Sequence, residues 1–190
     1  MKTQKINFMK ALSFIMLVFI LLPACTQPGK DNEAGIKVEK PKMDIHAAII
    51  SGNLEVVKQH IEAGTDINQK EPMSGSTPLI SAATFGKTDI AKALMEADPD
   101  LSIKNNDGAT ALHVAAFFCR VEIVQMLIDA NADKTIRNNF GATPRESVMG
   151  DFAEIKPIYG MMQEQLAPLG LNLDMDELEK TRPVIAMMLQ

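Results

Sequence analysis

Three patterns of apolar and polar residues follow one another along the chain. Residues 11–22 form an apolar run, and residues 26–42 are polar with glycine and proline. From residue 43 onward, apolar residues recur at helical spacing, as at Ile90, Ala93 and Leu94. The last pattern predicts short amphipathic helices that each bury one face, separated by turns.

The helical part of the chain repeats itself. Residues 75–94 (GSTPLISAATFGKTDIAKAL) align without a gap with residues 108–127 (GATALHVAAFFCRVEIVQML), at an offset of 33. Residues 102–110 and 135–143 match at the same offset, and residues 44–68 align with the second copy at an offset of 34. A fixed offset over several units indicates a repeat architecture, with one extra residue in the first connecting loop.

Each unit carries the same order of local signals. A Thr-Pro or Thr-Ala pair, as at Thr77 and Thr110, predicts the start of a first helix. The small pairs Ala82-Ala83 and Ala115-Ala116 allow two helices to approach closely. Residues that readily take a left-handed conformation are expected to end the second helices at Gly64, Asp98 and Asn131.

TPLISAA (77–83) and TALHVAA (110–116) resemble the T-P-L-H-x-A signature of ankyrin repeats. The resemblance covers about residues 43–150 and implies an all-α solenoid of helix-turn-helix units joined by short β-turn or hairpin loops. We expect repeats at about 43–72, 73–105 and 106–138, a degenerate capping repeat at 139–166, and a C-terminal helical cap at 167–190. Pro157 is expected to interrupt the second helix of the degenerate repeat, and the tail to form one or two short helices.

The front of the chain predicts export. Three lysines precede the apolar run, which is too short to span a bilayer comfortably. LPAC (22–25) resembles the lipobox of bacterial lipoproteins apart from Pro23, and implies that residues 1–24 are a signal peptide and that Cys25 is lipidated. The alternative is an ordinary signal peptide cut nearby. We expect residues 25–42 to be a flexible tether that holds the folded part at a membrane of the bacterial envelope. Thr26 favours the outer membrane, on its periplasmic side, because it replaces the aspartate that retains some lipoproteins in the inner membrane.

The charge balance excludes two kinds of partner. The net charge is −5, and removal of residues 1–24 leaves 16 basic against 24 acidic side chains. Binding to nucleic acid or to anionic lipid rests on clustered Lys and Arg, so neither partner is expected for the folded part.

No motif for catalysis or metal binding appears in the sequence. It has no nucleophile elbow, no Walker loop and no paired CxxC, and no two histidines share a helix face. In ankyrin repeats the histidine at the start of the first helix is structural, which the resemblance implies for His113 and His46. His60 is expected to be solvated on a second helix. We therefore expect no enzyme activity, cofactor, metal or small-molecule substrate.

Cys119 has two interpretations. It stands where the repeat usually has glycine, and the first interpretation is that it fills a tight turn simply as a small residue. With Cys25 lipidated, it has no partner for an intrachain disulfide, and the other interpretation is a reactive free thiol in an oxidising compartment. That second interpretation makes the chain a redox-linked envelope protein, which is the alternative to a protein-binding function.

The resemblance implies a monomer that binds another protein, which it stabilises, recruits or inhibits. Ankyrin repeats use the concave surface at the ends of their first helices and the tips of their loops. The candidate contact residues are Ile50, Ser51, Met73, Ser74, Ser76, Thr84, Phe85, Asn106, Asp107, Phe117, Phe118, Asn139 and Phe140. Exposed aromatic residues are typical interface anchors, but the alternative is that one phenylalanine of each pair turns inward and packs between repeats.

Overall fold

The computed structural model describes residues 39–190, and the expected signal peptide, Cys25 and most of the expected tether lie outside them. Three helix pairs come first: α1 (Ile45–Ser51) with α2 (Leu54–Glu62), α3 (Pro78–Thr84) with α4 (Thr88–Glu96), and α5 (Ala111–Phe117) with α6 (Val121–Asp129). The 3-10 helix η1 (Glu146–Val148), α7 (Phe152–Leu166), η2 (Ala167–Leu169) and α8 (Met175–Met188) follow. The described residues contain no strand, which confirms the all-α solenoid.

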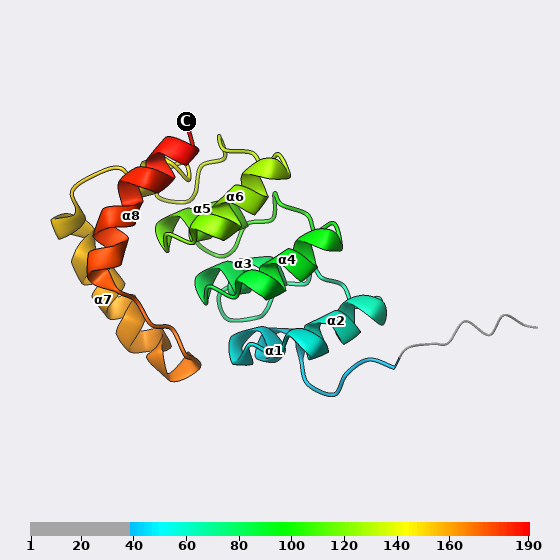
Figure 1. Ribbon diagram of the computed structural model, residues 1–190. Helices are drawn as coiled ribbons and strands as arrows, with labels where there is room; N and C mark the ends of the chain where they lie inside the picture. The colour runs from blue at the N-terminus through cyan, green and yellow to red at the C-terminus, as the bar shows by residue number, and fades with distance from the viewer. Residues whose placement is uncertain (1–38) are drawn as a thin grey trace, which may run out of the picture. The chain divides into compact units, whose positions relative to one another are not determined.

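The three pairs stack in chain order, first helix beside first helix and second beside second (Figure 1). Alanine pairs make the close stacking possible, because Ala82, Ala83, Ala115 and Ala116 are fully buried. The second helices turn the expected apolar side inward, although Val121 remains 38% exposed. Burial of these stripes against neighbouring repeats supplies most of the stability of a solenoid.

The expected start and stop signals of the helices are confirmed. Thr77 caps α3, with Pro78 in the first turn, and Thr110 caps α5 in a capping box with His113. In the first pair, Asp44 replaces the threonine, and its carboxylate accepts from the amides of the first turn of α1. Left-handed φ angles of 68°, 55° and 58° are found at the predicted stops Gly64, Asp98 and Asn131.

The prediction that Pro157 interrupts a helix is wrong. Pro157 lies inside the 15-residue α7, and Pro183 lies inside the 14-residue α8, so the tail forms one helix. A proline leaves the carbonyl four residues earlier without its helical donor. Here those carbonyls belong to the exposed residues Ala153 and Glu179, where water can satisfy them.

The last two helices close the C-terminal end of the stack. Leu178, Arg182 and Ile185 form the buried face of α8, which packs against α5, α6 and η1. Helix α7 buries Phe152 and Tyr159 and leaves most of its other residues exposed or half-buried. Figure 1 shows α7 and α8 side by side at one edge of the stacked pairs.

Candidate partner-binding surface

Neither phenylalanine at the end of α5 is freely exposed. Phe118 is 3% exposed, and Phe117 is half-buried. The ring of Tyr159 lies on Phe117 with centroids 4.5 Å apart, and its hydroxyl donates to the Phe117 carbonyl over 2.6 Å. In this repeat the inward-turned alternative is therefore the one observed, and the expectation that Phe118 is an exposed anchor is wrong.

The equivalent positions of the first two repeats offer few free polar groups. Ile50 and Phe85 are half-buried. The hydroxyls of Ser51 and Thr84 donate to the carbonyl four residues earlier in their own helices, over 2.9 and 3.0 Å. These four residues do not form a common site.

Three loop tips project between the helix pairs: the first tip is residues 71–76, the second 104–109 and the third 137–142. Asn106 joins the second tip to the first, because its backbone N–H donates to Ser74 O over 2.8 Å and its Nδ2 donates to Met73 O over 3.0 Å. Asn139 joins the third tip to the second in the same way, through Asp107 O at 2.9 Å and Asn106 O at 2.9 Å. Two of the candidate contact residues, Asn106 and Asn139, thus use their side-chain amides to hold the tips in register.

A carboxylate organises the first tip. Glu71 accepts from the amides of Met73 and Ser74, at 2.7 and 2.5 Å, and from the Ser74 hydroxyl. Burial raises the pKa of Glu71, but the Ser74 hydroxyl and the backbone amides outweigh this and lower it to about 2. The Ser74 hydroxyl also lies 2.7 Å from that of Ser76, which is buried rather than exposed as expected. Met73 is 90% exposed above this network.

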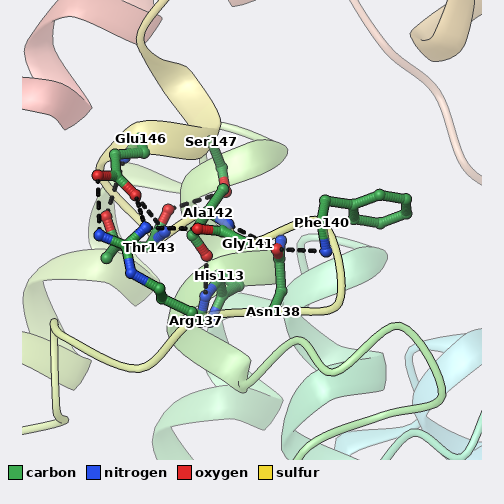
Figure 2. Close-up of polar contacts among 9 residues, drawn as sticks. All are labelled: His113, Arg137, Asn138, Phe140, Gly141, Ala142, Thr143, Glu146 and Ser147. Atoms are coloured by element: carbon green, nitrogen blue, oxygen red, sulfur yellow. Dashed lines mark hydrogen bonds and ion pairs between the residues drawn. The ribbon is translucent and has the colours of Figure 1, made fainter.

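Side chains from within and beyond the third tip hold its backbone in place (Figure 2). Asn138 Oδ1 accepts from the amides of Phe140 and Ala142, each at 3.0 Å. Arg137 pairs with Glu146 over 2.6 Å and also donates to the Gly141 carbonyl. The phenyl ring of Phe140 points away from this cluster and is 81% exposed.

His113 is structural, as expected, whereas His60 is buried instead of solvated. His113 is buried, its Nδ1 lies 2.9 Å from Thr110 Oγ1, and its Nε2 lies 3.1 Å from Ala142 O. Burial lowers the pKa of His113, which favours the neutral ring that accepts at Nδ1 and donates at Nε2. The prediction that His60 is solvated is wrong: it is 5% exposed, because its Nε2 reaches Met43 O at 2.7 Å and so fastens the entering chain to α2.

Cys119 takes φ 53°, the left-handed conformation that favours glycine at this place in the repeat. Burial raises the pKa of the thiol to about 11, although the neighbouring guanidinium groups of Arg182 and Arg120 lower it. The thiol also faces the Leu178 carbonyl at 3.9 Å. A thiol that stays protonated near neutral pH is a poor nucleophile, so these surroundings favour the turn-filling interpretation over the reactive one.

Residues 39–190 contain no group of three or more His, Cys, Asp or Glu side chains placed to hold a metal ion. Within the described part of the chain, no helix combines the length and apolar character needed to cross a bilayer.

The described residues thus form an all-α repeat solenoid that presents a rigid row of loop tips. Residues 45–138 match the family model for ankyrin repeats, in three copies, and these residues are ankyrin repeats.

Curated proteins match part of the chain in sequence. Human protein phosphatase 1 regulatory subunit 27 is 42% identical over 64 residues, which is 34% of this chain and 41% of that protein. The human DNA-binding protein RFXANK is 31% identical over 85 residues, 43% of this chain and 33% of that protein. The chain therefore spans less than half the length of these relatives. The repeats, together with relatives named as regulatory or binding proteins, support a protein-interaction module.

Proposed function

We propose that this chain is an exported, lipid-anchored adaptor that binds another protein of the bacterial envelope through its row of loop tips. The observation that carries the proposal is the contrast between its candidate surfaces. Phe118 is buried and Phe117 lies against Tyr159 of α7, whereas Met73 and Phe140 are 90% and 81% exposed on tips that are already rigid. A preorganised surface with exposed large side chains loses little conformational entropy on binding.

The anchor rests on the sequence alone. The basic leader, the short apolar run and LPAC (22–25) support cleavage before Cys25 and lipidation of its thiol. Substitution Cys25→Ser is expected to move the protein from the membrane fraction to the soluble fraction, with Cys119→Ser as the matched control that stays with the membrane. Membrane association of the Cys25→Ser variant would refute the anchor.

The partner is sought by crosslinking in intact envelopes, followed by purification of the chain. The variant carrying Met73→Ser and Phe140→Ser is expected to lose the crosslinked protein while keeping its helical content, because both side chains project into solvent. Met187→Ser is the matched control, since Met187 is a 61% exposed methionine on α8 rather than on a tip. Equal capture by the tip variant and the control would exclude the tips as the interface.

The proposal leaves three consequences of binding open: stabilisation, recruitment or inhibition of the partner. They differ in what loss of the chain does in cells. A stabilised partner falls in abundance, a recruited partner keeps its abundance but leaves the membrane site, and an inhibited partner gains activity.

A further inference from the structure

The joints between the tips show which chemical group this surface accepts. At each joint one asparagine donates twice, from its backbone N–H and from its Nδ2, to two consecutive carbonyls of the preceding tip. Those carbonyls belong to Met73 and Ser74 at the first joint and to Asn106 and Asp107 at the second. The acceptors form a two-pronged socket for a single asparagine residue.

A glycine completes each socket. A Cβ atom at Gly75 would lie 2.4 Å from Asn106 Oδ1, and a Cβ atom at Gly108 would lie 2.4 Å from Asn139 Oδ1. The inserted asparagine therefore needs a residue without a side chain beside it. Both glycines have left-handed φ angles, 69° and 70°, which keep the tip backbone in the turn that accepts the asparagine.

The third tip repeats all of these features at the same sequence offset. Gly141 has φ 77°, and no described residue lies within 4 Å of a Cβ atom built on it. No described donor reaches the carbonyls of Asn139 and Phe140, which correspond to the paired acceptors of the other tips. The backbone is held in place by Asn138 and Arg137, and the exposed ring of Phe140 points away from them (Figure 2).

We propose that the third tip is a binding socket for an asparagine presented on a turn of the partner protein, with Phe140 as the apolar contact beside it. The inference rests on the proposed protein-binding function and specifies the partner's chemistry. By the pattern of the two filled joints, the side-chain carboxamide of the partner's asparagine donates to Asn139 O, its backbone N–H donates to Phe140 O, and its amide oxygen lies over Gly141. The first tip offers no equivalent site for a donor, because Asn106 already donates to the carbonyls of Met73 and Ser74.

The probe is a cyclic peptide that copies residues 103–110 (IKNNDGAT), the segment that fills such a socket inside the chain. Added to the isotope-labelled full chain, it is expected to shift the amide resonances of Asn139, Phe140 and Gly141 in a saturable way. The same peptide with its second asparagine replaced by alanine should bind at least about tenfold more weakly, because both side-chain contacts are lost. No shift, or equal binding of the two peptides, would overturn the socket.

Two glycine variants make the test specific to the socket. Gly141→Ala places a methyl group where the carboxamide would lie, and is expected to abolish the shifts. Gly64→Ala adds the same backbone strain at φ 68°, also with nothing within 4 Å of the new carbon, and should leave peptide binding unchanged. Loss of binding in both variants would assign the effect to strain and overturn the socket.

Crosslinking separates this inference from the proposed function. A photo-crosslinking residue at position 140 should capture the partner in envelopes, and Phe140→Ala should weaken that complex about tenfold. Capture from position 73 without capture from position 140 would refute the socket and keep the adaptor function. Capture from neither position would refute both. Self-association of the chain that Gly141→Ala abolishes would identify a second copy as the occupant and overturn the proposal of a partner protein.

Discussion

At the residue scale, the first and third tips meet one requirement with different side chains. A tight tip exposes backbone amides that need acceptors, and Asn138 supplies them in the third tip while Glu71 does so in the first. An amide side chain does this at any pH. A carboxylate does it best when ionised, so the amides held by Glu71 are expected to respond to acid and those held by Asn138 are not.

Titration of Glu71 should follow from its lowered pKa. A pKa of about 2 in the folded chain, below the ordinary value of 4.5, means that the ionised carboxylate stabilises the fold at neutral pH. That contribution is complete above about pH 4.5 and is lost as the pH falls toward 2. The Glu71→Gln variant should be less stable at pH 7 by up to about 1 kcal/mol, a modest value because the group is largely solvated.

The measurement is urea unfolding of both proteins at pH 7 and near pH 2, together with carbon NMR titration of the Glu71 carboxyl. The difference in unfolding free energy should shrink toward zero at the lower pH. Glu122→Gln, on the exposed first turn of α6, is the matched control and should change little. A midpoint near 4.5 for Glu71 would contradict the hydrogen-bond argument.

At the element scale, substitutions of the tip glycines measure how closely the loop tips of neighbouring repeats pack. Gly108→Ala puts a Cβ atom 2.8 Å from the backbone nitrogen of Asn139, which cannot rotate away. Gly141→Ala carries the same left-handed strain at φ 77° with nothing within 4 Å, so it isolates the cost of strain, about 1–2 kcal/mol. Gly108→Ala should destabilise the chain by a further 1–3 kcal/mol or so, measured by chemical unfolding. Equal effects of the two substitutions would show that the joint between the tips yields freely.

The sequence predicted those elements whose causes are local. Thr77, Thr110 and the alanine pairs act within one helix or between adjacent copies, so a 33-residue offset was enough to place them. The continuity of α7 through Pro157 was missed, because it depends on whether water can reach the carbonyl of Ala153. Propensity alone does not contain that information.

The candidate surface was predicted less well, for a related reason. Phe118 occupies a position that faces a partner in a repeat taken by itself, but it is buried in the folded chain, and Tyr159 of α7 covers its neighbour Phe117. Tyr159 is the residue that holds this cover, and its spacing of seven from Phe152 was the available signal for a helix face. The exposed tips were predicted correctly at Met73 and Phe140, since loop tips project whatever packs on the helices.

At the scale of the whole molecule, stability at the C-terminal end depends on a polar chain of contacts inside an apolar cluster. The hydroxyl of Tyr159 donates to Phe117 O at 2.6 Å and accepts from Arg182 Nη1 at 3.0 Å. Arg182 is 4% exposed, and no described carboxylate lies within 4 Å of its guanidinium. One hydroxyl thus joins α5, α7 and α8, and it also solvates a buried cation.

Removal of that hydroxyl should loosen one end of the solenoid only. Tyr159→Phe keeps the ring on Phe117 but leaves a buried carbonyl and a buried guanidinium without their partner, at a cost of about 1–3 kcal/mol. Repeats interact with their nearest neighbours, so hydrogen exchange should quicken in α5 through α8 and remain unchanged in α1 and α2. The double variant Tyr159→Phe with Arg182→Met should recover part of the loss, because the unpaired charge is gone. Uniform loss of protection along the described chain would instead mean that the repeats and their cap unfold as one unit. The first and third tips would then unfold together with the cap.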